Sequence, residues 1–390
     1  MTDGLKVLQV SSGLDPRTGG TATAAVNVAL AARRAGVAVT LAYGVAPEAG
    51  ERLAPDLARL AAAGVRAVGF PFWAAGGRRA VRWAIAPGLD AYLAAHAGEF
   101  DLIHTHSAWV ASSVAAVRAA RRAGRPSLLM PHEALTRFDM ARGGNAGLRL
   151  AKRHLRRWYL RRADRIVVSS ELERADSALD DDPRALAIPH PVLDESLPAP
   201  PARTPTGGAL RVGFLGRLDP KKNLHRLAEA LGDAPGVELV IGGDGDPTYR
   251  AAVEAVIARH GVGARVTWRG FVDSAAKPGF FRDVDVIAMP SAFECFGLVA
   301  AEALGAGTPV IVSPTVGIAD MIANADCGAI VPPRSDALAA CLRRLGDGGE
   351  LVRWRANARR VALELFSFAA HGARLRAAYE TLLGAPRPPR

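Results

Sequence analysis

The alternation of short apolar segments with longer helical patterns constrains the fold of this chain more than any other feature. The stretches between the apolar segments are rich in alanine and leucine. Parallel strands need a crossover connection, usually a helix, so the alternation predicts an α/β fold with parallel sheets. The strand candidates in the first half are LKVLQVSS (5–12), VAVTLAY (37–43), VRAVGF (65–70), FDLIHTH (100–106), PSLLMP (126–131), RIVVSS (165–170) and ALAIPHP (185–191), and those in the second half are LRVGFLG (210–216), VELVIGG (237–243), ARVTWRG (264–270), DVIAMPS (285–291), PVIVSP (309–314) and CGAIVPP (327–333).

The 390 residues are enough for two domains, each with its own core. A stretch rich in Pro, Ala and Gly (189–210) separates the two sets of strands and is typical of a linker. We therefore predict an N-terminal doubly wound, Rossmann-like domain (1–195) and a C-terminal one (196–366). A last helix at about 367–385 could pack back on either domain. Ligands of such sheets bind outside the carboxyl ends of the strands, which predicts an active site in a cleft between two facing domains.

The net charge of +11 indicates an anionic partner, which could be nucleic acid, an anionic membrane surface or a phosphorylated small molecule. No zinc-finger, RNA-recognition or helix-turn-helix signature is present, so we expect no nucleic-acid partner. The densest basic stretch, RLAKRHLRRWYLRRADR (149–165), fits a helix on a membrane surface. It equally fits a core-packed helix with a solvated arginine face.

No apolar stretch is long enough for a transmembrane helix, and no secretory signal is visible at the N-terminus. We expect a cytoplasmic protein, with a peripheral position at the inner membrane face as an option. Three widely separated cysteines, Cys295, Cys327 and Cys341, match neither a metal site nor a disulfide framework. They are expected to be free thiols.

A pair of glycines, Gly19 and Gly20, follows the first strand and precedes a helical pattern. Paired glycines let the backbone approach a ligand closely, and the helix N-terminus behind them favours an anion. An ordinary strand-to-helix turn would also use glycine, so both interpretations stay open.

The second half opens with VGFLGRLDPKKNL (212–224), in which Lys221 and Lys222 follow Arg217 closely. The chain is rich in arginine and has few lysines, so two adjacent lysines are unusual here. A guanidinium together with an ammonium is suited to clamp a diphosphate. The alternative is a solvated loop.

Two acids, Glu294 and Glu302, lie in the otherwise apolar stretch AFECFGLVAAEALGAGTPV (292–310). Carboxylates are rarely buried without a partner. The pattern predicts Glu294 in a loop, with Phe296, Gly297 and Leu298 supplying the first amides of a helix that contains Glu302 and favours an anion. Alternatively, Glu294 merely caps the helix and Glu302 forms a buried salt bridge.

Two histidines, His104 and His106, end the fourth strand candidate and lie on the same side of it. A metal site is not expected there, because no third ligand follows at a suitable spacing. We predict His106 as a site residue and His104 as a packing residue.

The segment PHEALTRFD (131–139) follows the fifth strand candidate. It places His132, Glu133, Arg137 and Asp139 at the mouth of the N-terminal domain. These residues are candidates for an acceptor site, with an ordinary polar loop as the alternative.

Two motifs imitate other sites. The sequence DVDV (283–286) resembles a metal-binding Asp-x-Asp motif but runs directly into an apolar strand, so Asp283 and Asp285 are predicted to be structural. The sequence GGDGD (242–246) lacks the G-x-G-x-x-G spacing of a dinucleotide fingerprint, so NAD is not expected. This loop should line the nucleotide site instead.

The chain resembles the family 4 retaining glycosyltransferases of the GT-B fold. The resemblance rests on GRLDPKKNL (216–224), on ECFGLVAAEALGAGTPV (294–310), and on TGGTATAAVNVALAARRAGVAVTL near the N-terminus (18–41). It covers most of the chain in the same order. It implies two Rossmann-like domains and a nucleotide diphosphate-sugar donor.

The resemblance also assigns roles to single residues. Arg217 and Lys222 would hold the diphosphate, Glu294 with the amides of Phe296, Gly297 and Leu298 would contact the sugar hydroxyls and phosphate, and Glu302 would bind the ribose. The turn at Gly270, Phe271 and Val272 would lie beside the base, Gly20 would approach the diphosphate, and His106 would reach the donor sugar.

We therefore expect a metal-independent hexosyltransferase without cofactor, acting in polysaccharide or glycoconjugate synthesis. It would move a sugar from a UDP- or GDP-linked donor to a hydroxyl of a glycan, a lipid-linked acceptor or a small molecule, with retention. The departing phosphate would accept the proton, and Arg217, Lys222 and helix amides would stabilise its charge. The alternatives are a GT-B sugar-nucleotide epimerase and a non-catalytic carbohydrate- or membrane-associated binding protein.

Overall fold

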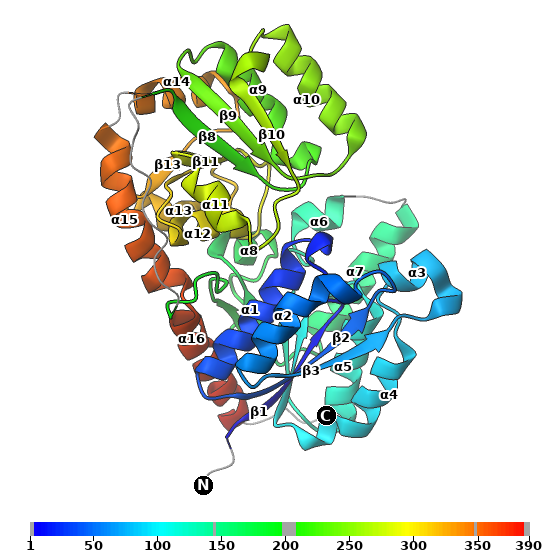
Figure 1. The fold of residues 1–390 in the computed structure, drawn as a ribbon. Coiled ribbons are helices and arrows are strands. Elements are labelled where there is room, and N and C mark those ends of the chain that lie inside the picture. Colours follow the sequence, from blue (N-terminus) through cyan, green and yellow to red (C-terminus); the bar gives the residue numbers. More distant parts are fainter. Residues whose placement is uncertain (1–3, 143–145, 197–207, 347–348, 386–390) are drawn as a thin grey trace. The chain divides into compact units, whose positions relative to one another are not determined.

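The computed structural model describes residues 4–142, 146–196, 208–346 and 349–385 (Figure 1). The chain divides into two compact units. The first unit comprises Met1–Pro191 and Phe368–Arg390, and the second comprises Val192–Ser367. The boundary between them lies close to the expected one at residues 195 and 196. Half of the expected linker, residues 197–207, lies outside the described residues.

The first unit is built on a parallel sheet. Its strands are β1 (Lys6–Ser11), β2 (Ala38–Val45), β3 (Arg66–Pro71), β4 (Leu102–His106), β5 (Ser127–Met130), β6 (Arg165–Val168) and β7 (Ala185–Ala187). The strand order is β3-β2-β1-β4-β5-β6-β7, and every pair is parallel. The order reverses between β1 and β4, which makes this position the switch point at which doubly wound sheets bind ligands.

Helices connect these strands. They are α1 (Gly20–Arg34), α2 (Gly50–Ala62), α3 (Gly77–Arg82), α4 (Pro87–His96), α5 (Ala111–Arg122), α6 (Arg137–Ala141), α7 (Ala146–Leu160) and α8 (Glu171–Asp176), with short 3-10 turns η1 (Pro16–Thr18), η2 (Ala74–Gly76) and η3 (Ala97–Glu99). The C-terminal helix α16 (Phe368–Gly384) joins the same unit and packs on α1. The approach is close, because a Cβ at Gly372 would lie 2.3 Å from the Ala31 carbonyl oxygen. Only glycine fits at that crossing.

The second unit repeats the architecture. Its strands are β8 (Leu210–Leu215), β9 (Val237–Gly242), β10 (Val266–Gly270), β11 (Val286–Met289), β12 (Val310–Val312) and β13 (Gly328–Ile330), in the order β10-β9-β8-β11-β12-β13 and all parallel. Its switch point lies between β8 and β11. Every strand candidate of the sequence thus forms a strand, and the predicted α/β class is confirmed.

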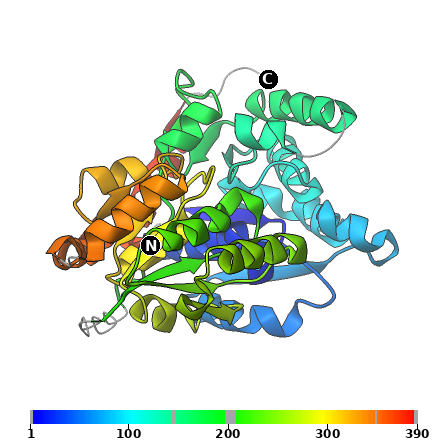
Figure 2. The ribbon, with the colours of Figure 1, turned by 90° about the horizontal axis from the view of Figure 1, so that it is seen from above.

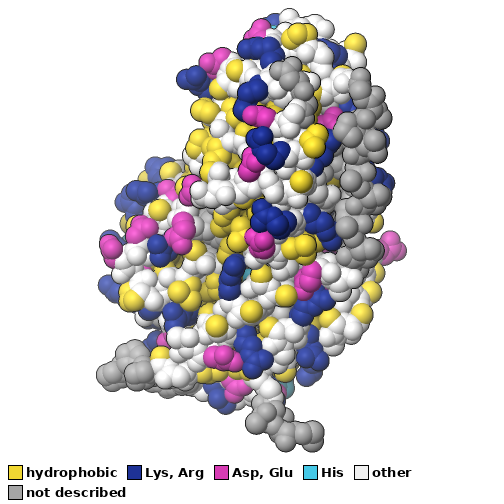
Figure 3. Space-filling view, turned by 90° about the vertical axis from the view of Figure 1, so that its left-hand side faces the viewer, with side chains coloured by type: hydrophobic (Ala, Val, Ile, Leu, Met, Phe, Trp, Pro, Cys, Tyr) yellow, Lys and Arg dark blue, Asp and Glu magenta, His cyan; other side chains and the backbone are white. Residues whose placement is uncertain are grey.

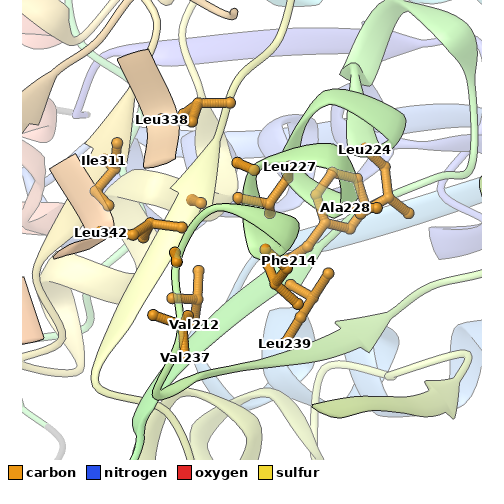
Figure 4. Close-up of a cluster of buried hydrophobic side chains, with 14 of the residues drawn as sticks. Val212, Phe214, Leu224, Leu227, Ala228, Val237, Leu239, Ile311, Leu338 and Leu342 are labelled. Carbon is orange, nitrogen blue, oxygen red and sulfur yellow. The ribbon is translucent and has the colours of Figure 1, made fainter. Parts of the chain in front are cut away.

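The helical elements of the second unit are η4 (Pro220–Lys222), α9 (Leu224–Gly232), α10 (Pro247–Arg259), η5 (Gly263–Arg265), α11 (Lys277–Arg282), α12 (Leu298–Gly305), α13 (Ala319–Ala323), α14 (Ser335–Gly346) and α15 (Gly349–Phe366). Helices α9 and α10 lie side by side on this sheet (Figure 2). Val212 and Phe214 of β8, Leu227 of α9 and Leu342 of α14 meet in its core (Figure 4). Alternate residues of a strand thus bury their side chains under helices, as doubly wound sheets require.

The two chain segments that pass from one unit to the other are bonded to each other. The amides of Val192 and Leu193 donate to the Phe366 carbonyl oxygen at 2.9 and 3.1 Å, and Leu193 forms a bridge with Ser367. On the side of the first unit, Asn27 donates to the Pro191 carbonyl oxygen at 3.0 Å. Residues 191–193 are therefore held in place by hydrogen bonds.

Candidate functional site

The loops that follow β8 and β11 meet at the switch point of the second unit. The Asn223 side chain donates to the Pro290 carbonyl oxygen at 2.9 Å, and the Ala292 amide donates to the Lys221 carbonyl oxygen at 2.8 Å. Two segments that lie about seventy residues apart in the sequence thus form one structure. The structure brings together the lysine pair and the first acid singled out from the sequence.

An ion pair joins these two loops. Lys222 Nζ lies 2.7 Å from Glu294 Oε1, and the exposed fractions of the two side chains are 19% and 15%. Burial opposes ionisation of Glu294, but the ammonium groups of Lys222 and Lys221 outweigh it and hold the pKa of the carboxyl below its usual range. The Glu294 carboxyl is therefore ionised at neutral pH.

Arg217 lies on the same loop with a largely free guanidinium. Its side chain is 66% exposed and lies 3.9 Å from the carboxylate of Asp219. Asp219 is occupied with the loop itself, because its side chain accepts from the Lys221 amide at 2.8 Å and caps η4. Arg217 can therefore turn toward an anion without leaving a buried partner behind.

The backbone around Glu294 is fixed by hydrogen bonds on both sides. Its amide donates to Thr315, its carbonyl oxygen accepts from Gly317, and the Ile318 amide donates to Phe296. Gly297 then has φ +106°, and a Cβ there would lie 2.6 Å from a methyl group of Val316. Only glycine allows the chain to turn here and begin α12.

Helix α12 starts at Leu298, so its first amides have no carbonyl partner one turn earlier within the helix. The Phe296 side chain is buried and meets Phe366 edge to face at 5.5 Å, which leaves only its backbone for a ligand. The predicted arrangement, a loop acid followed by helix amides, is present.

The second acid, Glu302, points to a partner that the sequence analysis missed. Lys277 Nζ of α11 lies 2.7 Å from both oxygens of the Glu302 carboxylate. The buried salt bridge that stood as the alternative is therefore present. The scarcity of lysine, which singled out Lys222, would also have singled out Lys277.

Glycines bring three loops into contact beside this site. The amide of Gly243 donates to the Gly270 carbonyl oxygen at 2.6 Å, and a Cβ at Gly243 would lie 1.9 Å from the Gly216 carbonyl oxygen. Phe271, in the predicted base turn, is 51% exposed, and Val272 follows it. The GGDGD loop thus packs on that turn and on the start of the Arg217 loop.

The aspartates of the DVDV segment are engaged in structural contacts. Asp285 accepts from Arg355 at 2.5 Å and from the Arg211 amide at 2.9 Å, and Asp283 pairs with Arg269 at 3.3 Å. Arginine side chains thus hold both carboxylates.

In the described part of the chain, no group of three or more His, Cys, Asp or Glu side chains could hold a metal ion. The three cysteines are thiols that take part in no disulfide, and burial raises the pKa of the Cys327 thiol to about 11. Among the described residues, no helix combines the length and the apolar character needed to cross a membrane.

Buried histidines mark the switch point of the first unit. His104 and His106 are fully buried and stack at 4.5 Å between ring centres. The Tyr379 hydroxyl of α16 lies 2.7 Å from His104 Nδ1. His104 therefore packs, as predicted, through a partner at the far end of the sequence.

His106 has both ring nitrogens engaged. Its Nδ1 lies 3.0 Å from His132 Nε2, and its Nε2 lies 3.4 Å from Gln9 Oε1. His132 is partly exposed and stacks in turn on His190 at 5.1 Å. The partly exposed ring of His132 thus contacts the buried rings of His106 and His190.

His190 and His371 complete this cluster, and the sequence analysis missed both. His371 of α16 lies 2.7 Å from the Pro189 carbonyl oxygen. Burial lowers the pKa of His371 to about 4, and it lowers the pKa values of His104, His106, His132 and His190 well below the usual range. The imidazoles are therefore neutral at pH 7.

The loop that carries His132 has an unusual backbone. His132 and Glu133 have φ values of +50° and +76°, a region that residues other than glycine rarely adopt. The Glu133 amide donates to Glu173 at 2.7 Å, and this fully buried carboxyl also accepts from the amide and hydroxyl of Ser169. Glu173 thus holds the strained loop in place, although no sequence signal set it apart.

The other two acceptor candidates have partners within the unit. Arg137 lies 3.3 Å from Asp176, and Asp139 accepts from Lys152 and from the Trp109 ring at 2.8 Å each. The structure thus brings His132 to His106 but directs Asp139 toward α7.

The predicted glycine pair lies where α1 begins. Gly19 has φ +113°, and a Cβ there would meet no atom within 4 Å, whereas Gly20 is the first residue of the helix. The space next to this backbone is open. The preceding Asp15 is occupied by Arg52 at 2.6 Å.

The basic stretch forms α7, and its aromatic residues face inward. Tyr159 is fully buried, and Leu155, Trp158 and Leu160 pack on the same core cluster. These contacts fit the interpretation of the stretch as a core-packed helix. On the face of the molecule in Figure 3, by contrast, basic side chains are interspersed with acidic ones.

Family comparisons agree with this geometry. Residues 202–361 match the model of "Glycosyl transferases group 1", and residues 19–186 match the "Glycosyl transferase 4-like domain". The D-inositol 3-phosphate glycosyltransferase of Mycobacteroides abscessus is 32% identical over 206 residues, which are 48% of this chain and 46% of the relative. An uncharacterized glycosyltransferase of Methanocaldococcus jannaschii is 34% identical over 40% of each chain. The chain thus matches less than half the length of these relatives.

Solved structures share the fold along nearly the whole chain. Anabaena HepE in complex with UDP and glucose matches with a TM-score of 0.75 and 21% identity, over 97% of this chain and 100% of its own. The sucrose-phosphate synthase of Thermosynechococcus elongatus matches with a TM-score of 0.78 and 22% identity, over 98% and 100%. These likenesses show the GT-B fold. Two adjacent family matches and this fold together show that the chain belongs to the group 1 glycosyltransferases.

Proposed function

We propose that the protein is a retaining glycosyltransferase that moves a hexosyl group from a UDP- or GDP-linked donor to an acceptor hydroxyl. The observation that carries the proposal is the Lys222–Glu294 pair, which joins the loops after β8 and β11 at the switch point of the second sheet. Ligands of doubly wound sheets bind at such points. The product would serve polysaccharide or glycoconjugate synthesis.

In this proposal the cations hold the donor's diphosphate. An ammonium has three donors, so Lys222 can bind a phosphate oxygen while it keeps its bond to Glu294. Arg217 has an exposed guanidinium that can approach from the same loop. The amides of Gly297 and Leu298 at the start of α12 add a partial positive charge. With these groups no metal ion is needed to balance the diphosphate.

The acids orient the remaining parts of the donor. Glu294 accepts from sugar hydroxyls, and Glu302 accepts from the ribose while Lys277 holds its carboxylate. A carboxylate has about four acceptor positions, so the lysine leaves room for hydroxyls. Phe271, next to Gly270 and Val272, offers an exposed ring for the base. Gly19 and Gly20 provide an open backbone for the anionic part.

In the first unit the proposal assigns the contact with the sugar to His132. His106 is fully buried and bonded at both ring nitrogens, so its contribution is to orient the His132 ring. A neutral imidazole can donate from one nitrogen and accept at the other, which suits hydroxyl groups. The acceptor would lie near the same loop.

The reaction follows from this arrangement. The acceptor oxygen attacks on the face that the diphosphate leaves, the glycosidic bond to phosphate breaks, and the departing phosphate takes the acceptor's proton. Lys222, Arg217 and the amides of α12 stabilise the charge that develops on the leaving group. Groups oriented before the reaction are the most effective in this role.

The names of similar proteins support this proposal. Anabaena HepE was solved with UDP, with UDP and glucose, and with UDP-glucose. The mycobacterial relative is described as a D-inositol 3-phosphate glycosyltransferase.

A panel of nucleotide sugars, scored for hydrolysis without acceptor, tests the proposal. UDP-linked sugars and GDP-mannose come first. We expect slow release of nucleotide from one donor, and we expect Lys222→Ala to abolish it. Lys6→Ala is a matched control, because Lys6 is an exposed lysine at the amino end of β1.

Other results would point to other functions. Conversion of the donor to a second nucleotide sugar, detected by mass spectrometry, would indicate an epimerase. Failure to bind UDP, GDP or ADP by calorimetry would indicate a non-catalytic binding protein. Either outcome would overturn the proposal.

A further inference from the structure

A cavity in the first unit is lined by five arginines. It has a volume of about 620 Å³ and lies between α6, α7 and the turn after α8. Its lining comprises Arg137, Arg149, Arg153, Arg156 and Arg157, together with Leu135, Met140, Ala141 and Ala178. Cavities that hold small ligands have volumes of this order.

The arginines reach the cavity because of their spacing along α7. Arg149, Arg153, Arg156 and Arg157 are separated by four, three and one residues, so they share one face of the helix. The opposite face is used for packing, since Tyr159 is fully buried and Leu155 and Trp158 contact the core. Helix α7 therefore presents these arginines on one face and packs Leu155, Trp158 and Tyr159 on the other.

Two acids close to the cavity already have basic partners. Asp176 pairs with Arg137 at 3.3 Å and accepts from the Phe138 amide at 3.0 Å. Asp139 is taken by Lys152 of the same helix. Among the arginines that line the cavity, Arg137 thus has a carboxylate partner.

Arg156 of α7 differs from Arg153 and Arg157 in its contacts. Arg156 donates to the Ser177 carbonyl oxygen at 2.5 Å, and burial lowers the pKa of its guanidinium. Neither Arg153 nor Arg157 has an ion-pair partner within the part of the chain that the structure describes. Like charges gathered in one place repel one another unless an anion joins them.

We propose that this cavity binds a phosphate-bearing group, either a phosphate monoester or a diphosphate. One guanidinium group can bind two phosphate oxygens at once through two parallel N–H donors. Several guanidinium groups around one cavity can therefore surround a phosphate. The apolar residues Leu135 and Met140 line the same space and can contact the part that carries the phosphate. The group can belong to a soluble sugar phosphate or to a lipid. The binding step does not rest on the proposed transferase activity.

Calorimetry and vesicle sedimentation test the proposal and separate the two sources. Glycerol 3-phosphate and inorganic pyrophosphate are the soluble probes. Pyrophosphate is titrated into Lys222→Ala protein, so that the proposed donor site contributes little. Vesicles of phosphatidylcholine, with and without phosphatidic acid, represent the lipid source.

The decisive variant is Arg153→Gln/Arg157→Gln. The control is Arg121→Gln/Arg122→Gln, which removes the same charge from the exposed end of α5. We expect the first variant to weaken binding by roughly 10-fold or more and the control by less than twofold, because charge-assisted hydrogen bonds are lost only in the first. Circular dichroism confirms that both variants are folded.

The outcomes are distinct. Binding of a soluble probe that depends on Arg153 and Arg157 supports a soluble source, and binding of phosphatidic acid vesicles alone supports a lipid. If no probe binds, or if the control loses as much affinity as the α7 variant, the proposal is wrong. Inactivity toward every nucleotide sugar would leave these titrations unaffected.

Discussion

The polar groups at the two switch points of this molecule differ in charge. In the second unit, Lys222–Glu294 and Lys277–Glu302 place full charges against one another at 2.7 Å. In the first unit, His104, His106 and His132 are stacked as neutral rings. The same strand order thus supports an ionic site in one unit and an uncharged, hydrogen-bonding site in the other. A diphosphate needs the former, whereas sugar hydroxyls need only donors and acceptors.

The largest expected effect comes from breaking the ionic site at Lys222. Lys222→Ala leaves the Glu294 carboxylate buried without its partner and removes a cation from the proposed phosphate site. Turnover should fall at least ~100-fold, in line with the loss of one preorganised charge. The measurement is donor hydrolysis and transfer at saturating donor. Rates close to those of the unmodified protein would refute the assignment.

Next is Glu294→Gln, which keeps the shape of the side chain and removes its charge. The amide cannot form the same ion pair with Lys222, and the proposed bonds to the sugar weaken. We expect kcat to fall by about 10-fold to 100-fold, the range for hydrogen bonds to charged groups. Steady-state kinetics with the donor found in the panel measure it. A change confined to KM would show that Glu294 only binds the donor.

The neutral site of the first unit should respond to acid. Unfolded histidine has a pKa near 6.5, whereas folded His371 has a pKa of about 4, so unfolding takes up a proton between these values. The contribution of neutral His371 to the free energy of unfolding is therefore fully present above about pH 6.5 and is lost as the pH falls toward 4. For His371→Gln, the loss of unfolding free energy between pH 7.5 and pH 5 should be smaller by about 2 kcal/mol.

Urea unfolding at the two pH values checks this prediction. His154→Gln is the matched control, because His154 is an exposed histidine of α7. Its unfolding midpoints should follow those of the unmodified protein. Equal pH dependence in the His371 variant would show that the buried cluster does not govern acid stability.

The smallest effect is expected for Glu302→Gln. Lys277 can still donate to the amide oxygen, so the local structure should persist. We expect the KM for the donor to rise about fivefold, equivalent to roughly 1 kcal/mol, while kcat changes little. A larger loss in kcat than in affinity would mean that Glu302 acts in the chemical step rather than in ribose binding.

The strands and the α/β class could be predicted from the sequence because the buried strands consist largely of apolar residues and alternate with helical patterns. Lys222 and Glu294 could be singled out because their motifs follow predicted strands, but their ion pair could not be predicted. Contacts between distant segments carried no such signal. His371 and Tyr379 meet the switch point of the first sheet only because α16 returns to that unit. Glu173 was equally invisible, since its role depends on the positive φ angles of His132 and Glu133.

The position of α16 in the first unit determines which of the two units can finish folding first during synthesis. The second unit is continuous in sequence, whereas the first needs Phe368 to Gly384 to cover α1. These residues follow the second unit in the sequence, so the ribosome releases them after it and the second unit can finish folding before the first one does. Until α16 has been synthesised, the side of α1 on which it packs stays exposed to solvent. We expect proteases to cut nascent chains near this exposed side of α1.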